Sequence, residues 1–167
     1  MNRELIMPLS LLFGLVAFGL TAKWYVMPWL KSVSRKRALT PLLLLHSFRY
    51  IGLAFLIPGV TVQALDAGFT IPAAYGDLLA AVLALVALIA VRLDWSVATP
   101  LMWIFNIVGT LDLVNALYQG GQRIPVGDLG ATYFIPTVVV PGLLVTHFMI
   151  FVLLVRQPPN WRIEPTS

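Results

Sequence analysis

The chain has 167 residues, of which 59% are hydrophobic and only 11% are charged, and its mean hydropathy is +0.89. A soluble domain carries about 25% charged residues, so this composition excludes an ordinary globular protein. The net charge is +4, but the basic residues flank apolar segments instead of forming one face, so we expect no nucleic-acid partner. Cysteine is absent, which excludes disulfides, thiolate metal sites and cysteine nucleophiles.

Five segments are long and apolar enough to be transmembrane helices, which need about 20 mostly apolar residues. They cover residues 5–22, 40–62, 73–91, 97–117 and 133–155. The pairs Thr40-Pro41 and Thr99-Pro100 each predict a capping hydroxyl followed by a first-turn proline. The short connection at 92–96 predicts an antiparallel hairpin. We therefore predict an all-α, polytopic membrane protein, a single domain over residues 1–167 that forms a bundle of five transmembrane helices.

The distribution of charge predicts the orientation of this bundle. If the spans alternate, eight basic residues fall on one side: Lys23, Lys31, Arg35, Lys36, Arg37, Arg92, Arg156 and Arg162. The other side has Arg3 and Arg123, together with Glu4, Asp66, Asp77 and Asp128. An aromatic belt accompanies the basic side: Trp24, Tyr25, Trp29, Trp95 and Trp161. The positive-inside rule then predicts an external N-terminus, a cytoplasmic C-terminus and a multi-pass protein of the cytoplasmic membrane.

The first and third spans carry few polar groups. Residues 78–91 contain none, and Ser10 and Gly14 in the first span would let a neighbouring helix approach closely. We therefore expect any chemistry on the second, fourth and fifth spans. The basic and aromatic segment 23–39 is interpreted either as an interfacial helix that binds anionic lipid or as a topological anchor. The connections 63–72 and 118–132 are expected to be ordered turns.

Four ionisable side chains lie inside the predicted spans, where a charge costs several kcal/mol, roughly 2.5–3.5 on insertion scales. Counting about 1.5 Å per helical residue from the basic side places His46 at about 9 Å and Arg49, Asn106 and His147 at about 13 Å. Asp112 comes out at about 20 Å by the same count. We predict a polar pocket between the second, fourth and fifth spans that opens toward the cytoplasmic half. Its residues would be His46, Arg49, Tyr50, Asn106, Asp112 and His147.

The leading interpretation is that this intramembrane pocket binds or transports a small or lipid-like molecule in a protein surrounded by the lipid bilayer, with proton coupling through the histidines and Asp112. Arg49 would hold an anionic or carbonyl group, and the histidines would titrate. A purely structural Arg49–Asp112 ion pair is the alternative for those two residues.

Three other functions stay open. In a b-type membrane cytochrome, His46 and His147 would ligate one haem iron; apart from haem we expect no metal. An enzyme would use one of these histidines as general base, although no HExxH or GxSxG motif supports it. Lastly, the chain could be a non-catalytic subunit or assembly factor whose polar residues contact a partner helix, either of a second copy in an oligomer or of a partner subunit.

Overall fold

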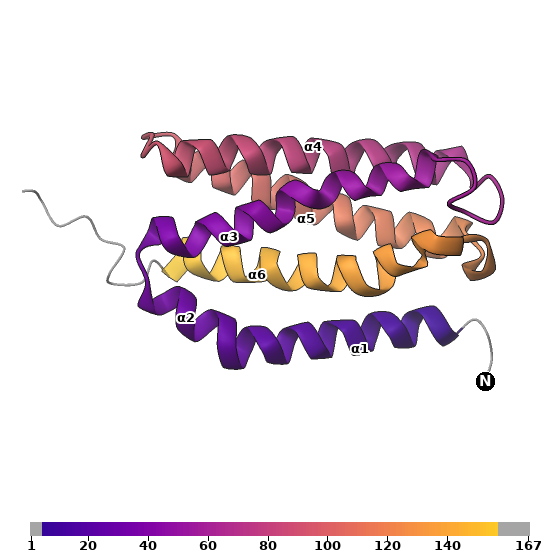
Figure 1. The fold of residues 1–167 in the computed structure, drawn as a ribbon, viewed down its shortest axis with the longest axis horizontal. Helices are drawn as coiled ribbons and strands as arrows, with labels where there is room; N and C mark the ends of the chain where they lie inside the picture. Colours follow the sequence, from indigo (N-terminus) through magenta and orange to yellow (C-terminus); the bar gives the residue numbers. More distant parts are fainter. Residues whose placement is uncertain (1–4, 157–167) are drawn as a thin grey trace, which may run out of the picture.

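The computed structural model describes residues 5–156, and within that range every regular element is helical. Five helical segments are long and apolar enough to cross a membrane, and they lie side by side as an elongated bundle (Figure 1). These segments are Ile6–Ser32, Arg35–Leu56, Ala67–Arg92, Ala98–Arg123 and Gly130–Arg156. The prediction of an all-α chain with five membrane-length helices is confirmed.

The first segment is longer than predicted. Helix α1 (Ile6–Thr21) continues through a π-helical stretch, η2 (Ala22–Val26), into α2 (Met27–Ser32). Only Val33 and Ser34 have extended backbone before the next helix. Residues 23–39 therefore form no separate interfacial helix, because they are divided between two long helices, and their role as a topological anchor stays a prediction. No residue of α1 is buried; this helix lies at the side of the bundle, mainly against α6.

The second segment changes its helical form halfway. It begins as α3 (Arg35–Ser47) and tightens into the 3₁₀ helix η3 (Phe48–Leu56). Pro41 lies inside α3, and the Thr40 hydroxyl donates to the Lys36 carbonyl at 2.7 Å, so this Thr-Pro pair does not begin the helix. A 3₁₀ helix has three residues per turn, and the buried residues of η3 are accordingly three apart: Arg49, Gly52 and Phe55.

Helices α4 (Ala67–Arg92) and α5 (Ala98–Arg123) form the predicted antiparallel hairpin, with the turn at 93–97. Pro100 is in the first turn of α5 as expected, but Val97 occupies the cap position. The Thr99 hydroxyl instead accepts a hydrogen bond of 2.5 Å from Arg35 Nη2. A face of small residues on α4, buried at Ala80, Ala84 and Ala87, lets neighbouring helices pack closely.

The fifth segment is irregular at its start. Two 3₁₀ turns, η4 (Val126–Asp128) and η5 (Gly130–Tyr133), lead into the π-helical η6 (Ile135–Val139) and then α6 (Val140–Arg156). The wide π turn comes immediately before Pro141, which has no N–H for a regular helical bond. A Cβ on Gly14 of α1 would lie 2.9 Å from the Thr137 carbonyl oxygen and 2.9 Å from Cγ of Pro141. Glycine at position 14 therefore allows the close approach of α1, as the sequence predicted.

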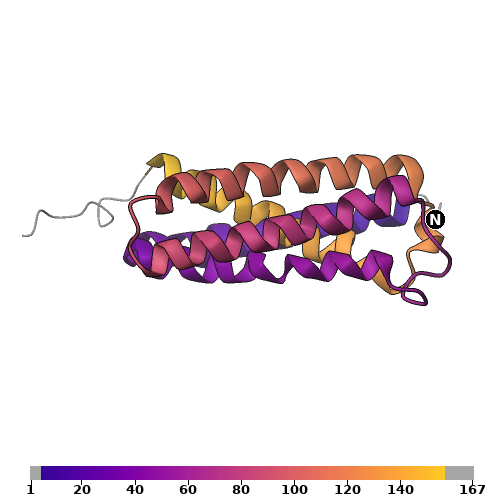
Figure 2. The same ribbon diagram turned by 90° about the horizontal axis from the view of Figure 1, so that it is seen from above.

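The two ends of the bundle differ in charge. The basic end, as we name it, holds Lys31, Arg35, Arg92 and Arg156. Helices α2, α4 and α6 end there and α3 and α5 begin there, at the left in Figure 2. At the opposite end, the loops at 57–66 and 124–129 are joined by backbone hydrogen bonds, such as Val62 N–H to the Asp128 carbonyl at 3.0 Å. Both connections are hydrogen-bonded turns, but they do not cover the predicted 63–72 and 118–132 in full, because residues 67–72 belong to α4 and residues 118–123 to α5. Arg3, Glu4, Trp161 and Arg162 of the orientation argument lie outside the described residues.

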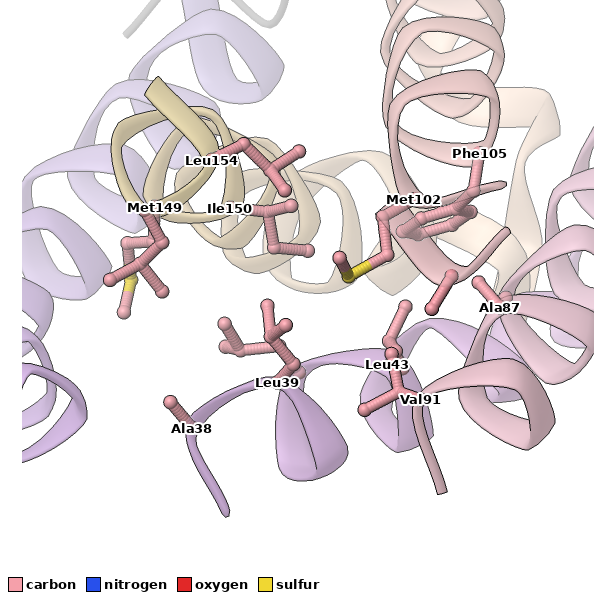
Figure 3. Close-up of a cluster of buried hydrophobic side chains, with 14 of the residues drawn as sticks. Ala38, Leu39, Leu43, Ala87, Val91, Met102, Phe105, Met149, Ile150 and Leu154 are labelled. Carbon is pink, nitrogen blue, oxygen red and sulfur yellow. The ribbon is translucent and has the colours of Figure 1, made fainter. Parts of the chain in front are cut away.

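Two apolar clusters fill the bundle, one toward each end. The cluster toward the basic end joins α3, α4, α5 and α6 through side chains such as Leu43, Met102 and Ile150 (Figure 3). The other cluster includes Phe55, Phe69 and Leu113. On α4 and on α5 the polar residues come between the parts that belong to these two clusters. The candidate site therefore separates two apolar cores near mid-bundle.

Candidate functional site

Arg49 is the centre of the buried polar cluster and is 1% exposed. Its Nε and Nη2 atoms each lie 2.8 Å from Oδ1 of Asp77 on α4, and Nη2 lies 2.5 Å from Oδ2 of Asp112 on α5. Its Nη1 donates to the Gly109 carbonyl at 2.9 Å and lies 3.3 Å from Nε2 of His147 on α6. Nε therefore donates to Asp77, Nη1 to the Gly109 carbonyl and Nη2 to Asp112. Arg49 thus links its own segment to three other helices.

Three glycines make room for this cluster. A Cβ on Gly52 would overlap the Asp77 carboxylate, and one on Gly76 would overlap the Asp112 carboxylate. A Cβ on Gly109 would lie 2.8 Å from Arg49 Nη1. Real Cβ atoms do not approach neighbours so closely, so each glycine is required by the packing of a charged group. The position of Gly109, about 17 Å along the roughly 39 Å of α5, puts the cluster near the middle of the bundle.

His147 and Asn106 form a second, directional part of the site. The Asn106 side-chain Nδ2 donates to the His147 backbone carbonyl at 3.2 Å, which fixes the orientation of the amide. The amide oxygen Oδ1 then faces His147 Nδ1 at 2.6 Å, so Nδ1 carries the proton and donates. In the neutral ring Nε2 is left as an acceptor, and this atom faces the Arg49 donor. The network therefore requires the Nδ1–H tautomer of His147.

His46 lies directly beside His147, with ring centroids 4.0 Å apart, and is fully buried. Its Nε2 is 3.0 Å from the hydroxyl of Thr146, which also lies within 3.0 Å of two helix carbonyls. If that hydroxyl donates to a carbonyl, as threonine in helices commonly does, His46 Nε2 is the donor. Its Nδ1 is the one buried side-chain nitrogen or oxygen without a hydrogen-bond partner among residues 5–156.

The structure brings five of the six predicted site residues together: His46, Arg49, Asn106, Asp112 and His147. Tyr50 is the exception, since it is 53% exposed on the outside of the bundle. Consecutive residues of a helix point about 100–120° apart, so Tyr50, which directly follows Arg49, does not share its buried face. The Arg49–Asp112 ion pair that the sequence suggested is present.

Asp77 is the site residue that the sequence reasoning missed. The charge distribution places it among the external charges, and the apolar sequence of α4 predicts no chemistry there, but Asp77 is 8% exposed and pairs with Arg49. A signal was available, because the carboxylate lies inside the predicted span 73–91 and should have been counted with the other intramembrane charges.

Two hollows approach the cluster from different sides. A cavity of about 40 Å³, large enough for a few water molecules, reaches Asp77 from the end opposite the basic end. Its walls are apolar and include Phe69, Leu113 and Leu129. The sequence predicts a pocket that opens toward the basic half of the bundle. The cavity that reaches the Asp77 carboxylate instead lies on the opposite side. A groove of about 320 Å³ between α1, η3 and α6 has Arg49 in its lining.

The charges of the cluster do not balance. One guanidinium contacts two carboxylates, and no second Lys or Arg forms an ion pair with Asp77 or Asp112 within the described residues. With both histidines neutral, the cluster has a formal charge of −1. Uncompensated charge in an apolar interior is costly, so the arrangement favours an additional proton or cation at the carboxylates.

The site does not fit haem. Two axial histidines must approach the iron from opposite faces of the macrocycle. Here the rings of His46 and His147 pack against each other at 4.0 Å, and both nitrogens of His147 face protein groups, so no macrocycle can lie between them. Within residues 5–156 no group of three or more His, Cys, Asp or Glu residues is arranged to hold a metal ion.

One family comparison covers nearly the whole helical bundle. The model of the family described as "Domain of unknown function (DUF8737)" matches residues 6–155, and the chain therefore belongs to this family. No curated protein and no solved structure matches the chain.

Proposed function

We propose that this member of the family binds a small, largely apolar molecule within the membrane and couples that binding to a proton held at Asp77 and Asp112. The observation that carries the proposal is the charge imbalance of the cluster: one arginine faces two carboxylates where two hollows approach it. Intramembrane ionisable residues commonly mark proton relays and substrate pathways.

The proton route follows from the cavity beside Asp77. Its volume suits a short file of water, and it reaches the carboxylate from the opposite end of the bundle. A proton that enters there neutralises one carboxylate, while the other keeps its ion pair with Arg49. A small cation in the same place would serve the same balance, and the two cases are separated below.

The molecule itself would enter through the groove between α1, η3 and α6. This groove is lined by apolar side chains such as Phe18, Phe48 and Leu143, with Arg49 among them, and its volume of about 320 Å³ is within the range of small-molecule sites. The 3.3 Å contact between Arg49 Nη1 and His147 is the longest in the cluster. A carbonyl or hydroxyl oxygen would displace it most easily. An uncharged ligand is favoured because the cluster is already negative.

Infrared spectroscopy of the purified protein tests the charge balance. At neutral pH and in a buffer free of small metal cations, the wild type should show the carbonyl stretch of a protonated carboxylic acid. The band should vanish in Asp77→Asn and in Asp112→Asn, because either change leaves one carboxylate for one arginine. The control is Asp94→Asn, whose carboxylate is exposed and pairs with Lys36. If the wild type lacks the band and gains no thermal stability from sodium or potassium, the proposal is refuted.

We also infer that the basic end faces the cytoplasm and that the membrane is the cytoplasmic membrane, following the positive-inside rule. The chain has no cysteine, so single introduced cysteines test this directly. Gly127→Cys should react with an impermeant maleimide in intact cells, and Leu93→Cys only after lysis. The reverse pattern would contradict the orientation. Roles as an enzyme or as a subunit of a larger complex stay predictions.

A further inference from the structure

A second groove, separate from the charged cluster, runs between the first and last spans toward the basic end. It has a volume of about 600 Å³ and is lined by α1, η2 and α2 on one side and by α6 on the other. From Leu144 to Arg156 it follows about 18 Å of α6. Leu15, Leu144 and Phe148 are among the apolar residues in its wall.

Two basic side chains stand where this groove reaches the basic end. Lys23 of η2 and Arg156 of α6 both line it and are both exposed. Among residues 5–156, neither forms an ion pair with an acidic side chain. Trp24 and Tyr25, next to Lys23, are 59% and 72% exposed, as expected for aromatic residues at a membrane interface.

Small residues on the side of the groove formed by the first span keep the groove open. Gly19 has nothing within 4 Å of a Cβ built on it, and Ala22 also presents only a small side chain. The π-helical turn Ala22–Val26 begins at this place, and π turns inside helices often occur at functional sites.

We propose that this groove binds one phospholipid with an anionic headgroup. One acyl chain of the lipid lies between α1 and α6, and its phosphate pairs with Lys23 and Arg156. We choose an anionic lipid because of charge complementarity. The groove is apolar and about as long as an acyl chain, and it ends at Lys23 and Arg156, which lack an acidic partner among the described residues. Basic pockets between helices near the membrane surface bind anionic lipid headgroups by this chemistry. The inference does not depend on the function proposed for the buried cluster.

Native mass spectrometry of the full-length protein in mild detergent tests the site. The protein is incubated with equal amounts of phosphatidylglycerol and phosphatidylcholine that have the same acyl chains. Wild type should retain phosphatidylglycerol in preference to phosphatidylcholine. Each basic residue near a membrane surface contributes about a fivefold factor in affinity for anionic lipid, so Lys23→Gln with Arg156→Gln should lower that preference about thirtyfold. The control, Lys31→Gln with Arg92→Gln, changes two basic residues of the same end that do not line the groove.

A second variant tests the apolar part. Gly19→Leu should fill the groove and reduce retention of both lipids, whereas Gly121→Leu, a position on α5 that is equally open, should not. Equal retention of the two lipids by wild type would overturn the proposal, as would an unchanged preference in the Lys23/Arg156 variant. Displacement of the lipid by inorganic phosphate alone would show a simple anion site, and a dimer in place of the lipid would show that a second copy covers the groove. Either result also overturns it.

Discussion

Replacing Arg49 by methionine should be among the most destabilising single changes in the bundle. Methionine is unbranched like the aliphatic part of arginine, but it lacks the guanidinium. The change therefore removes the only cation that contacts Asp77 and Asp112 within the described residues. Breaking a buried ion pair by removing one partner costs about 3–5 kcal/mol, because the other charge stays buried and unpaired. Here two carboxylates lose their partner, so we expect a loss in that range in the free energy of unfolding.

The assay is equilibrium unfolding in mixed micelles of increasing SDS content, followed by far-UV circular dichroism. Arg123→Met is the matched control, since its 3.3 Å pair with Asp66 joins side chains that are 46% and 49% exposed. Pairs of that kind contribute about 0–1 kcal/mol. A loss for Arg49→Met no larger than that of Arg123→Met would refute the reasoning.

A combined variant separates charge from packing. If the loss comes from orphaned charge, Arg49→Met together with Asp77→Asn and Asp112→Asn should recover about half of it or more, because no ionised group is then left unpaired. If the combined variant is as unstable as Arg49→Met alone, the guanidinium acts through its shape and hydrogen bonds, and the electrostatic account is wrong.

The same assay checks two further contrasts. Gly76→Ala places a methyl group where the Asp112 carboxylate lies and should cost about 1–3 kcal/mol, whereas Gly121→Ala meets no atom within 4 Å and should be neutral or stabilise the helix by up to about 1 kcal/mol. Equal effects would contradict the packing role of Gly76. His147→Phe deprives two buried groups of a hydrogen-bond partner and should cost about 1–3 kcal/mol, while His46→Phe removes a ring with one unpartnered nitrogen and should cost less. The opposite order would contradict the hydrogen-bond network described for the two rings.

The sequence by itself determined the five spans and most of the cluster. Apolar runs of membrane length need helices, since backbone groups have no other hydrogen-bond partners in lipid. The same cost makes each intramembrane charge conspicuous, so Arg49, Asp112 and both histidines could be found by reading alone. The depth count brought Arg49, Asn106 and His147 to one level, and these three side chains do meet.

Counting residues along the sequence could not predict where the helices end or which side chains face the interior of the bundle. Polar and aromatic residues of 23–39 extend helices as readily as they end them, so the boundary at Val33 depends on how α2 turns into α3. Arg49 packs against α4, α5 and α6, and this leaves its neighbour Tyr50 on the outside of the bundle. Both are consequences of packing between segments, which leave no periodic mark in the sequence of either one.

Only the tertiary structure decided the charge state and the access of the site. Asp77 lies near the end of its predicted span, where a carboxylate could equally face external water, and the contact with Arg49 buries it instead. That contact turns an expected one-to-one ion pair into one arginine with two carboxylates. The cavity beside Asp77 lies on the side away from the basic residues, which the sequence did not indicate. The physical reason is that the order of residues along the chain fixes which charges lie inside long apolar helices, whereas helix packing fixes which of them neutralise one another.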